Sequence, residues 1–566
     1  MSWGRIVRPV EGALGRQNPL MSLLNVKFSV RGLEKLIGDH LMRRVAFYSL
    51  YAGLVACVAH SGFAQTIGSS GLVSGPRVDA GMDRTPHATA PVQGEVHTLT
   101  DAIRLTYWRN PTLLSQRANV RATDNRLPQA RAAYGLNLSA QGTYGYQRDR
   151  FQTVLGWAGN QGWSSVATAI LTQPLYTFGR NAGREKVALA QIAFARDTLR
   201  LTETQMLLDT INAYVSVIRD RENVSIAKEN IDLLSRQLTD SRARYEVRDI
   251  TGADLQQIET RVELGKAQLL LAQGQVASSE AQFLKLVGAA PGELLPPTEL
   301  DVALGTIDQA YSISERRSPV IRAAQSREKI SRATVDAVRA EFGPRIDLRG
   351  TASYGTVTPY SDNLRATELR GEVALSMPLL DGNLRLSRLR EAQEANSADW
   401  RLIEQAVRDT NEAIASSWQQ LATTRISLEN YSRAVEAARK AYEGAVEQEA
   451  AGARTTLDVL DLARDLLNVR NGYVSARADE YALRAGLLAA VGELDATQIV
   501  PDVERYDPDV HLEKVRGRGD TPLLTPLLSG IDHITSGARM DDRPVTDPGA
   551  ALRISPALVI PPAPRP

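Results

Sequence analysis

The sequence contains the same unit twice, and this duplication limits the folds open to it. The first copy opens with Thr98-Leu-Thr-Asp-Ala and reaches Asn110-Pro111. The second opens with Thr306-Ile-Asp-Gln-Ala and reaches Ser318-Pro319, at a constant offset of 208 residues. Later matches, at offsets of 210 and 204 residues, pair Leu136-Asn-Leu with Ile346-Asp-Leu and Gln173-Pro-Leu with Met377-Pro-Leu. A unit of about two hundred residues is far longer than a solenoid repeat, so each copy is closer to a half-molecule.

Each copy contains two segments in which apolar and polar side chains alternate. In the second copy Leu369, Val373 and Leu375 share one face, while Arg370 and Glu372 share the other. Alternation over about ten residues is the pattern of a membrane β-strand, although the strands of a soluble sandwich also alternate. We expect strands near 136–147, 165–176, 345–355 and 368–379.

Four strands are too few to close a barrel around a water-filled lumen, and an open sheet edge is not tolerated in lipid. No run of eighteen apolar residues occurs outside the N-terminal region, so we expect any membrane span to consist of strands. Several chains would then have to share one barrel. The charged strand residues are expected to line its wet interior, namely Arg345, Asp347, Arg349, Arg370 and Glu372.

The rest of each copy predicts long helices. Apolar and small residues recur at coiled-coil spacing between Ala227 and Tyr245 in the first copy and between Leu428 and Ala445 in the second. We expect one helix over 180–246, with 254–287 returning beside it. At ~1.5 Å per residue, the longer helix would extend roughly 100 Å. A cytosolic coiled-coil scaffold would leave the strands and the export signal unexplained.

Both ends of the chain differ from the two copies. Arg43 and Arg44 precede an apolar run, which predicts a signal peptide cleaved after Ala64. Alternatively, Leu54-Val-Ala-Cys57 is a lipobox and Cys57 is acylated. The expected organisation is a possible misassigned extension (1–41), the signal (42–64), a linker (65–94), the first copy (95–291), a linker (292–304), the second copy (305–495) and a Pro-rich, largely disordered tail (496–566).

Several functional classes find no support in the sequence. The 66 basic and 65 acidic residues nearly cancel, whereas a nucleic-acid surface needs a clustered positive excess. The six histidines lie outside the core of both copies, so no His/Cys group is expected to hold zinc or to act as a nucleophile. No phosphate-binding loop or dinucleotide fingerprint is present. We therefore expect no cofactor and no enzymatic activity.

Residues from about 95 to 500 resemble the TolC family of outer-membrane factors. The motifs that match are the Thr98 opening, Asn110-Pro111, Gln173-Pro-Leu-Tyr176 and Pro378-Leu-Leu-Asp-Gly382, within the doubled order of helix, two strands and helix pair. The resemblance implies an α+β membrane protein that is a homotrimer, with four strands per protomer in one twelve-stranded β-barrel. It also implies a long α-helical coiled-coil barrel that crosses the periplasm from the outer membrane of a Gram-negative bacterium.

The resemblance assigns a gate to the turn at the inner end of the second copy. Gly452 and Asp458 keep the family spacing, and Asp461 follows on the same helix face. Three chains would bring these carboxylates to a constriction, with divalent cations as possible blockers. An aspartate at a helix start also caps the helix, but one cap does not require two carboxylates, so we favour the gate.

A closed-state lock is also implied near these turns. Arg454 falls where the family places a basic lock residue, and Asp254 is a plausible acceptor in the first copy. For Asp254, capping is as well supported as gating. Two positions depart from the family pattern, because Glu449 stands where a lock-forming tyrosine is frequent and Arg248 replaces the usual glycine.

The function implied by the resemblance is an exit duct that contacts outer-membrane lipid. A periplasmic adaptor (membrane fusion protein) and an inner-membrane ABC or RND transporter would dock near 246–254 and 450–458. The duct would serve type I protein secretion or multidrug efflux, and the lack of a clear lipobox favours a secreted protein as cargo. The alternative is a periplasmic coiled-coil adaptor, which would have an export signal and a long hairpin but not two hairpins in tandem with paired strands.

Overall fold

The computed structural model describes residues 95–300, 305–522 and 524–535. The signal peptide, extension and linker assigned to 1–94, and the tail beyond 535, lie outside the described residues. Within them, Gln141–Thr168 and Tyr354–Ala366 form a small unit, and the remainder forms a larger one. No described helix combines the length and the apolar character that crossing a membrane would require.

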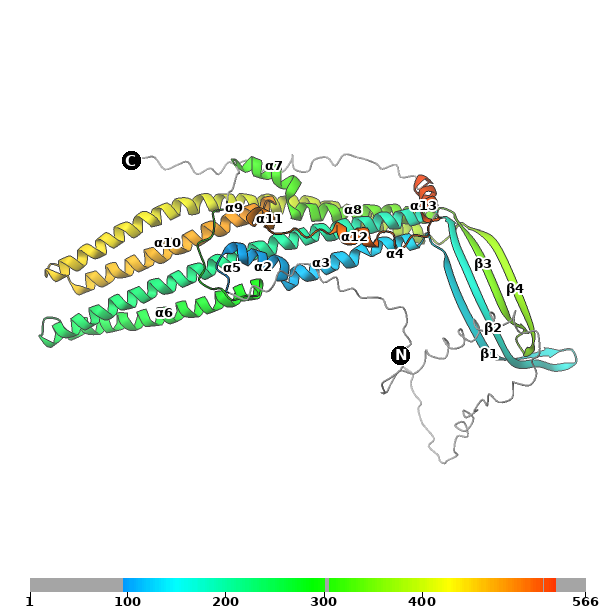
Figure 1. Cartoon of the computed structure of the whole chain (residues 1–566), viewed down its shortest axis with the longest axis horizontal. Coiled ribbons are helices and arrows are strands. Elements are labelled where there is room, and N and C mark those ends of the chain that lie inside the picture. The colour runs from blue at the N-terminus through cyan, green and yellow to red at the C-terminus, as the bar shows by residue number, and fades with distance from the viewer. Residues whose placement is uncertain (1–94, 301–304, 523, 536–566) are drawn as a thin grey trace, which may run out of the picture. The chain divides into compact units, whose positions relative to one another are not determined.

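Both copies fold in the same order, with short helices, two strands and two long helices (Figure 1). The first copy consists of α2 (Leu99–Arg109), α3 (Pro111–Asp124), α4 (Arg126–Ala132), β1 (Asn137–Thr153), β2 (Gly156–Tyr176), α5 (Arg180–Glu246) and α6 (Gly252–Val287). The second consists of α7 (Ile307–Arg317), α8 (Pro319–Arg339), the 3-10 turn η3 (Ala340–Phe342), β3 (Arg345–Thr358), β4 (Ser361–Ser376), α9 (Leu384–Ala450) and α10 (Thr456–Val491). They are followed by α11 (Ala496–Ile499), α12 (Asp509–Val515) and α13 (Leu524–Thr535).

The helices start at threonines that recur in both copies. The hydroxyls of Thr98 and Thr306 each accept a hydrogen bond from the backbone N–H three residues further on. Thr251 and Thr455 do the same at the starts of α6 and α10, where the third helical residue is an aspartate that completes a capping box. The predicted helix over 180–246 is confirmed, since α5 has those bounds and 67 residues.

The four strands form one sheet in the order β1-β2-β3-β4. They contain 17, 21, 14 and 16 residues, so they extend well beyond the predicted segments. The ranges 148–163 and 356–367, which lie between the predicted strands, are mostly strand. Pairing with neighbouring strands satisfies the backbone there, and composition does not report that pairing. In this sheet β1 and β4 are the edge strands.

The small unit is held by contacts between adjacent strands. The rings of Tyr144 and Trp163 stack, with centroids 5.0 Å apart and an interplanar angle of 9°. Gly162 lies against the backbone of Tyr360, where an added Cβ would overlap the carbonyl oxygen. A glycine is therefore required at position 162 for these two segments to approach each other.

Two buried apolar clusters occupy corresponding places in the two copies. In the first copy, residues of α2, α5 and α6 meet around Tyr214 and Phe283. In the second, residues of α7, α9 and α10 meet around Tyr311, Ile414 and Leu487. The first cluster is larger, because it also takes in residues of α10 (Ala478, Tyr481, Ala485 and Leu488) and apolar residues that follow α10 (Leu494, Ala496, Val500 and Val503).

The prediction of a largely disordered tail from residue 496 is wrong for residues 496–522 and 524–535. This segment forms α11, α12 and α13, and it packs on the first copy, where α12 contacts α3 and α13 contacts α5. Its partners lie hundreds of positions earlier in the chain. A segment that is ordered by such distant contacts needs no strong helical periodicity of its own.

The backbone conformation of the turns after α5 and α9 predicts that two substitutions there differ in their effect on the free energy of unfolding. These turns place Arg248 and Gly452 at left-handed φ values of 64° and 72°. A side chain in this conformation costs about 1–2 kcal/mol, so Gly452→Ala should lower the free energy of unfolding by about 1 kcal/mol. Arg248→Ala is the matched control, because it exchanges one side chain for another at the same φ. Urea unfolding in detergent, followed by circular dichroism, should show a loss for Gly452→Ala alone, and equal losses would contradict this account.

Candidate functional site

The turn between α9 and α10 holds the residues assigned to the gate. Asp458 is the third residue of α10, and its Oδ2 accepts hydrogen bonds from the Thr455 N–H at 3.3 Å and the Thr455 hydroxyl at 2.9 Å. The capping role, which was the alternative to gating, is therefore present. Both bonds use Oδ2, and no hydrogen bond to Oδ1 is found within the described residues. The capping box thus fixes an exposed carboxylate and leaves one of its oxygens available.

Asp254 has the same arrangement at the start of α6. Its Oδ2 accepts from the Thr251 N–H at 3.1 Å and from the Thr251 hydroxyl at 2.7 Å. These hydrogen bonds stabilise the charged carboxylate and lower the pKa of Asp254. Both inner turns therefore present a capped aspartate at the same position of the repeat, although Asp254 is half-buried and Asp458 is exposed.

Asp461, the second expected gate residue, is in an ion pair. Its Oδ1 accepts from Nη2 of Arg261 on α6 at 3.0 Å. Arg464, one turn further along α10, is 3.8 Å from the same oxygen. Asp458 and Asp461 thus differ in this chain, because the first has a free oxygen and the second connects the two helical hairpins.

Glu449, expected in the lock, is the centre of a polar contact between the hairpins. It accepts hydrogen bonds from the Thr456 hydroxyl at 2.6 Å and from Gln237 of α5 at 2.9 Å. Arg244, also on α5, lies 3.4 Å from the same oxygen. Arg454, in contrast, is exposed, and within the described residues its side chain forms no ion pair. The expected pair of Arg454 with Asp254 is not formed within one chain.

Further ion pairs connect α10 to α5 above these turns. Arg470 is 2.7 Å from Glu229, and Arg477 is 2.6 Å from Glu222. Below them, Leu460 of α10 packs on a small apolar cluster from α5 and α6. We call these contacts, together with those of Glu449 and Asp461, the hairpin seam. Sequence reasoning missed Arg244, Arg261, Arg470 and Arg477, because their partners lie about two hundred or more positions away in the chain.

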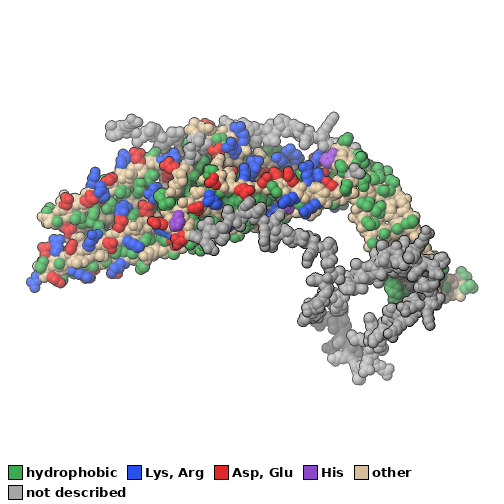
Figure 2. Space-filling model, in the orientation of Figure 1, with side chains coloured by type: hydrophobic (Ala, Val, Ile, Leu, Met, Phe, Trp, Pro, Cys, Tyr) green, Lys and Arg blue, Asp and Glu red, His purple; other side chains and the backbone are tan. Residues whose placement is uncertain are grey.

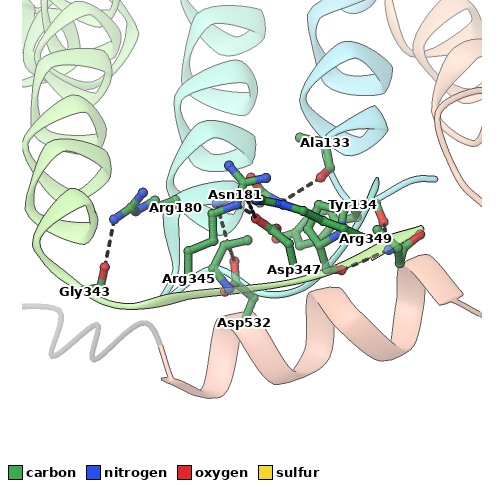
Figure 3. A network of polar contacts seen from close by, with 12 residues as sticks. Ala133, Tyr134, Arg180, Asn181, Gly343, Arg345, Asp347, Arg349 and Asp532 are labelled. Atoms are coloured by element: carbon green, nitrogen blue, oxygen red, sulfur yellow. Dashed lines mark hydrogen bonds and ion pairs between the residues drawn. The ribbon is translucent and has the colours of Figure 1, made fainter. Parts of the chain in front are cut away.

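The charged strand residues expected to line the lumen fall into two groups. Arg370 and Glu372 are exposed, and Arg370 is 3.1 Å from Glu368. Asp347, however, is only 2% exposed and lies between Arg345 at 2.8 Å and Arg349 at 3.9 Å (Figure 3). Asp347 is thus buried in this chain instead of being exposed to water, because its neighbours neutralise it at the base of the sheet.

A second site of polar contacts lies where β2 ends and α5 begins. Arg180 donates to the carbonyl oxygens of Glu341 and Gly343, both at 2.8 Å. Asn181 donates to the Ala133 carbonyl at 3.0 Å. The first residues of α5 therefore connect the end of α4 with the segment that leads into β3 (Figure 3).

The N-terminus of α5 is capped by a residue of α13. Oδ1 of Asp532 accepts from the Gly179 N–H at 2.8 Å, while Oδ2 accepts from the Thr177 hydroxyl at 2.8 Å and the Ala182 N–H at 3.2 Å. In Figure 3, Asp532 extends from α13 towards these groups. The carboxylate is 2% exposed. A buried anion at a helix N-terminus is stabilised by the free N–H groups and by the helix dipole.

In the second copy, the acceptor for the start of the long helix α9 is a residue close by in the sequence. Asp381 lies 204 positions after Thr177, and its Oδ2 accepts from the N–H of Arg385 at 3.1 Å and from its Nε at 2.5 Å. These bonds lower the pKa of Asp381. The first copy has a threonine at this position, so its carboxylate must come from elsewhere. The only sequence signal of this site is that the first copy has Thr177 where the second copy has an aspartate. This signal did not identify Asp532.

Comparison with known proteins finds relatives along both copies. The sequence model of the family described as "Outer membrane efflux protein" matches residues 102–289 and 310–493. Outer membrane efflux protein BepC of Brucella suis is 28% identical over 427 residues, which cover 74% of this chain and 91% of BepC. Outer membrane protein TolC of Escherichia coli is 22% identical over 414 residues, covering 69% of this chain and 81% of TolC. The crystal structure of the Campylobacter jejuni CmeC outer membrane channel has the same fold, with a TM-score of 0.63 at 12% identity over 75% of this chain and 90% of the CmeC chain.

Removal of the Asp532 carboxylate should destabilise the protein. Asp532→Ala leaves a buried hydroxyl and several N–H groups without an acceptor, so the free energy of unfolding should fall by about 2 kcal/mol. Asp509→Ala makes the same change in the same segment at an exposed ion pair with Arg196, where about 0–1 kcal/mol is expected. Urea unfolding, with limited proteolysis of the C-terminal segment, measures both. A larger loss for Asp509→Ala would contradict the capping role.

Proposed function

This chain belongs to the outer membrane efflux protein family, the TolC-like family that its motifs predicted, and on that premise we propose that it is a homotrimeric exit duct. The protein is located in the outer membrane and extends into the periplasm. Its family is a family of channels, and the proposed role is passive, so it requires neither a catalytic site nor a cofactor. Substrates would pass through the duct from an inner-membrane transporter to the cell exterior.

The observation that carries this proposal is the four-stranded sheet with two free edges. The apolar residues on one face of β4 are exposed, among them Leu369, Val373 and Leu375. Lipid around this face would leave the edges of β1 and β4 without hydrogen-bond partners. Three protomers joined edge to edge, β4 of one to β1 of the next, would form a closed twelve-stranded barrel and pair both edges. In this arrangement the opposite face, with Arg370 and Glu372, would be turned to the lumen.

Figure 2 supports the division into a membrane part and a periplasmic part. Charged side chains cover the helices, whereas hydrophobic and uncharged side chains predominate over the visible strands. A lipid-facing surface excludes charge, and a helical barrel in the periplasm is exposed to water. The two kinds of surface therefore fit the two environments that the duct would occupy.

The inner turns provide the proposed gate. Three copies of Asp458, each with a free oxygen, would form a ring of carboxylates that favours cations and binds divalent cations. Asp461 would join this ring only when its ion pair with Arg261 opens. The exposed Arg454 would be available to a neighbouring protomer as the closed-state lock, with Asp254 as its acceptor. Opening would therefore be coupled to separation of the hairpins along the seam.

Partners would supply both the energy and the trigger for opening. We propose that a periplasmic adaptor and an ABC or RND transporter dock at the turns near 246–254 and 450–458. Docking there would compete with the contacts of Glu449 and Asp461, so the hairpins would move apart. The proposed setting is type I protein secretion or multidrug efflux.

Conductance tests the gate directly. The purified protein in a planar bilayer should give a small, cation-selective conductance that divalent cations block from the periplasmic side. Asp458→Ala combined with Asp461→Ala should enlarge this conductance and weaken the block, because the ring of negative charge is removed. Asp465→Ala is the control, since it removes an exposed carboxylate one turn further along α10. An unaltered conductance and selectivity in the double variant would exclude the gate, and the absence of any channel from folded protein would favour the adaptor alternative.

Loosening the hairpin seam should also favour the open state. Glu449→Ala removes acceptors for Thr456, Gln237 and Arg244, and hydrogen bonds to charged groups contribute about 1.5–3 kcal/mol each. The time-averaged conductance should rise. Glu443→Ala is the matched control, because among the described residues Glu443 pairs only with Arg439 on its own helix. If both variants conduct like the original protein, the seam does not hold the closed state.

A further inference from the structure

Helix α13 has one face buried on the protein and one face that is largely exposed in the described part of the chain. Thr525, Leu528 and Asp532 are buried, and their spacing places them on one side of the helix. The remaining large side chains recur at intervals of three, four and three residues, which is the spacing of a second stripe. This stripe is 43–85% exposed in the described chain and consists of Leu524, Leu527, Ile531 and Ile534.

No charge interrupts the exposed stripe. The ionisable residues of α13 are Asp532 and His533, and Asp532 is committed to the cap of α5. Four neighbouring aliphatic side chains on a short helix form an apolar patch of the kind that marks a contact surface. The cap also prevents the helix from turning this face inward, because rotation would withdraw Asp532 from Thr177 and Gly179.

Other contacts hold the preceding segment in place. The Tyr506 ring lies 5.0 Å from the guanidinium of Arg117, which is buried. His511 is 2.8 Å from the buried Asp124, and Asp520 is 3.4 Å from Arg131. These partners belong to α3 and α4 of the first copy. The segment is therefore attached along its length, and the stripe of α13 is presented at a fixed place.

That place is the boundary of the proposed membrane strands. Asp532 contacts residues 177–182, directly after the end of β2. Aromatic side chains gather at this level, since Tyr176 and Phe178 have ring centroids 6.3 Å apart and Phe178 and Phe342 are part-exposed. Aromatic residues at strand ends are typical of the interface between a membrane and water.

Basic residues precede the apolar stripe. Lys514, Arg516 and Arg518 have exposed side chains, and within the described part of the chain none of them forms an ion pair. An apolar helix face beside free cationic groups matches the chemistry of a phospholipid surface, which offers acyl chains and negatively charged phosphates together.

The sheet order argues against a neighbouring protomer as the occupant. Helix α13 packs on α5, which follows β2, and β2 is an inner strand. Protomers of the proposed trimer would meet at the edge strands β1 and β4. The stripe therefore lies over the middle of the protomer, where lipid is the neighbour.

We infer that α13 is an interfacial helix that binds the phospholipid surface on the periplasmic side of the outer membrane. Leu524, Leu527, Ile531 and Ile534 contact the boundary of the acyl chains, and the basic segment contacts phosphates. Asp532 attaches the same helix to the start of α5. The C-terminal segment thus connects the bilayer to the junction between strands and helices. This inference rests on the proposed duct.

A fluorescent label on α13 tests the contact. Leu527→Cys is made in a Cys57→Ser background, because Cys57 is the one cysteine of the sequence. The labelled full-length protein is placed in vesicles of phosphatidylethanolamine and phosphatidylglycerol. Brominated acyl chains should quench the label, and aqueous iodide should not. Bromines near the carbonyl end should quench most, since an interfacial helix lies about 5–10 Å into the boundary.

Two control labels separate the possible outcomes. Val510→Cys lies on α12 and is 50% exposed, so iodide should quench it. Leu369→Cys lies on β4, is 81% exposed and should be quenched by bromine if the strands face lipid. Quenching of Leu369→Cys without Leu527→Cys would overturn the inference and leave the duct intact, whereas bromine quenching of neither would contradict the duct as well. A Leu527→Cys label that both quenchers miss, with cross-links between subunits, would assign the stripe to a neighbouring protomer and also overturn the inference.

Discussion

The hydrogen bonds at the start of each long helix decide how the rest of the chain is arranged. Helices α5 and α9 follow β2 and β4 after connections, and backbone acceptors there satisfy only part of the N–H groups of their first turns, so side-chain acceptors are also needed. In the second copy the side chain of Asp381 is such an acceptor and lies four positions before its donor. In the first copy the side chain of Asp532 is the acceptor and lies 350 or more positions after its donors. This difference attaches α13 to the start of α5, in addition to the contacts that hold the preceding residues on the first copy. It also makes two copies with the same order of elements chemically unlike at the base of the sheet.

At the opposite ends of the long helices, the turns of the two copies are alike. There both copies use the same capping box, so the duplicated turns present Asp254 and Asp458 in equivalent positions. What holds the hairpins together is a set of cross-hairpin contacts, several of which are exposed ion pairs such as Arg470 with Glu229. Exposed pairs contribute only about 0.2–1 kcal/mol each, which suits contacts that would open and close in the proposed gate. The apolar clusters around α2 and α7 are buried, so in that proposal the hairpins would separate at their tips while their bases stay packed.

In the proposed duct, the sheet would need strands of other chains at its edges. Its order leaves β1 and β4 as edges, and edges in lipid require partners. In the proposed trimer, other protomers would lie at the edge strands and lipid would lie over the inner strands. Helix α13 packs on α5, which follows the inner strand β2, so in that arrangement it would be nearer to the bilayer than to another subunit.

The sequence by itself determined the duplication, the extent of α5, the alternation that indicated strands, and the family, because repeated motifs and side-chain periodicity are local properties. It also placed Asp254 and Asp458 at helix starts, where capping is a matter of three neighbouring residues. Only the tertiary structure decided where the strands end, that Asp347 is buried, that Asp461 pairs with Arg261, and that residues 496–522 and 524–535 include α11, α12 and α13. These features depend on hydrogen bonds and ion pairs between residues up to several hundred positions apart. No local sequence pattern indicates such a pairing. The sequence around an exposed arginine on a long helix is therefore the same whether its partner is a carboxylate or water.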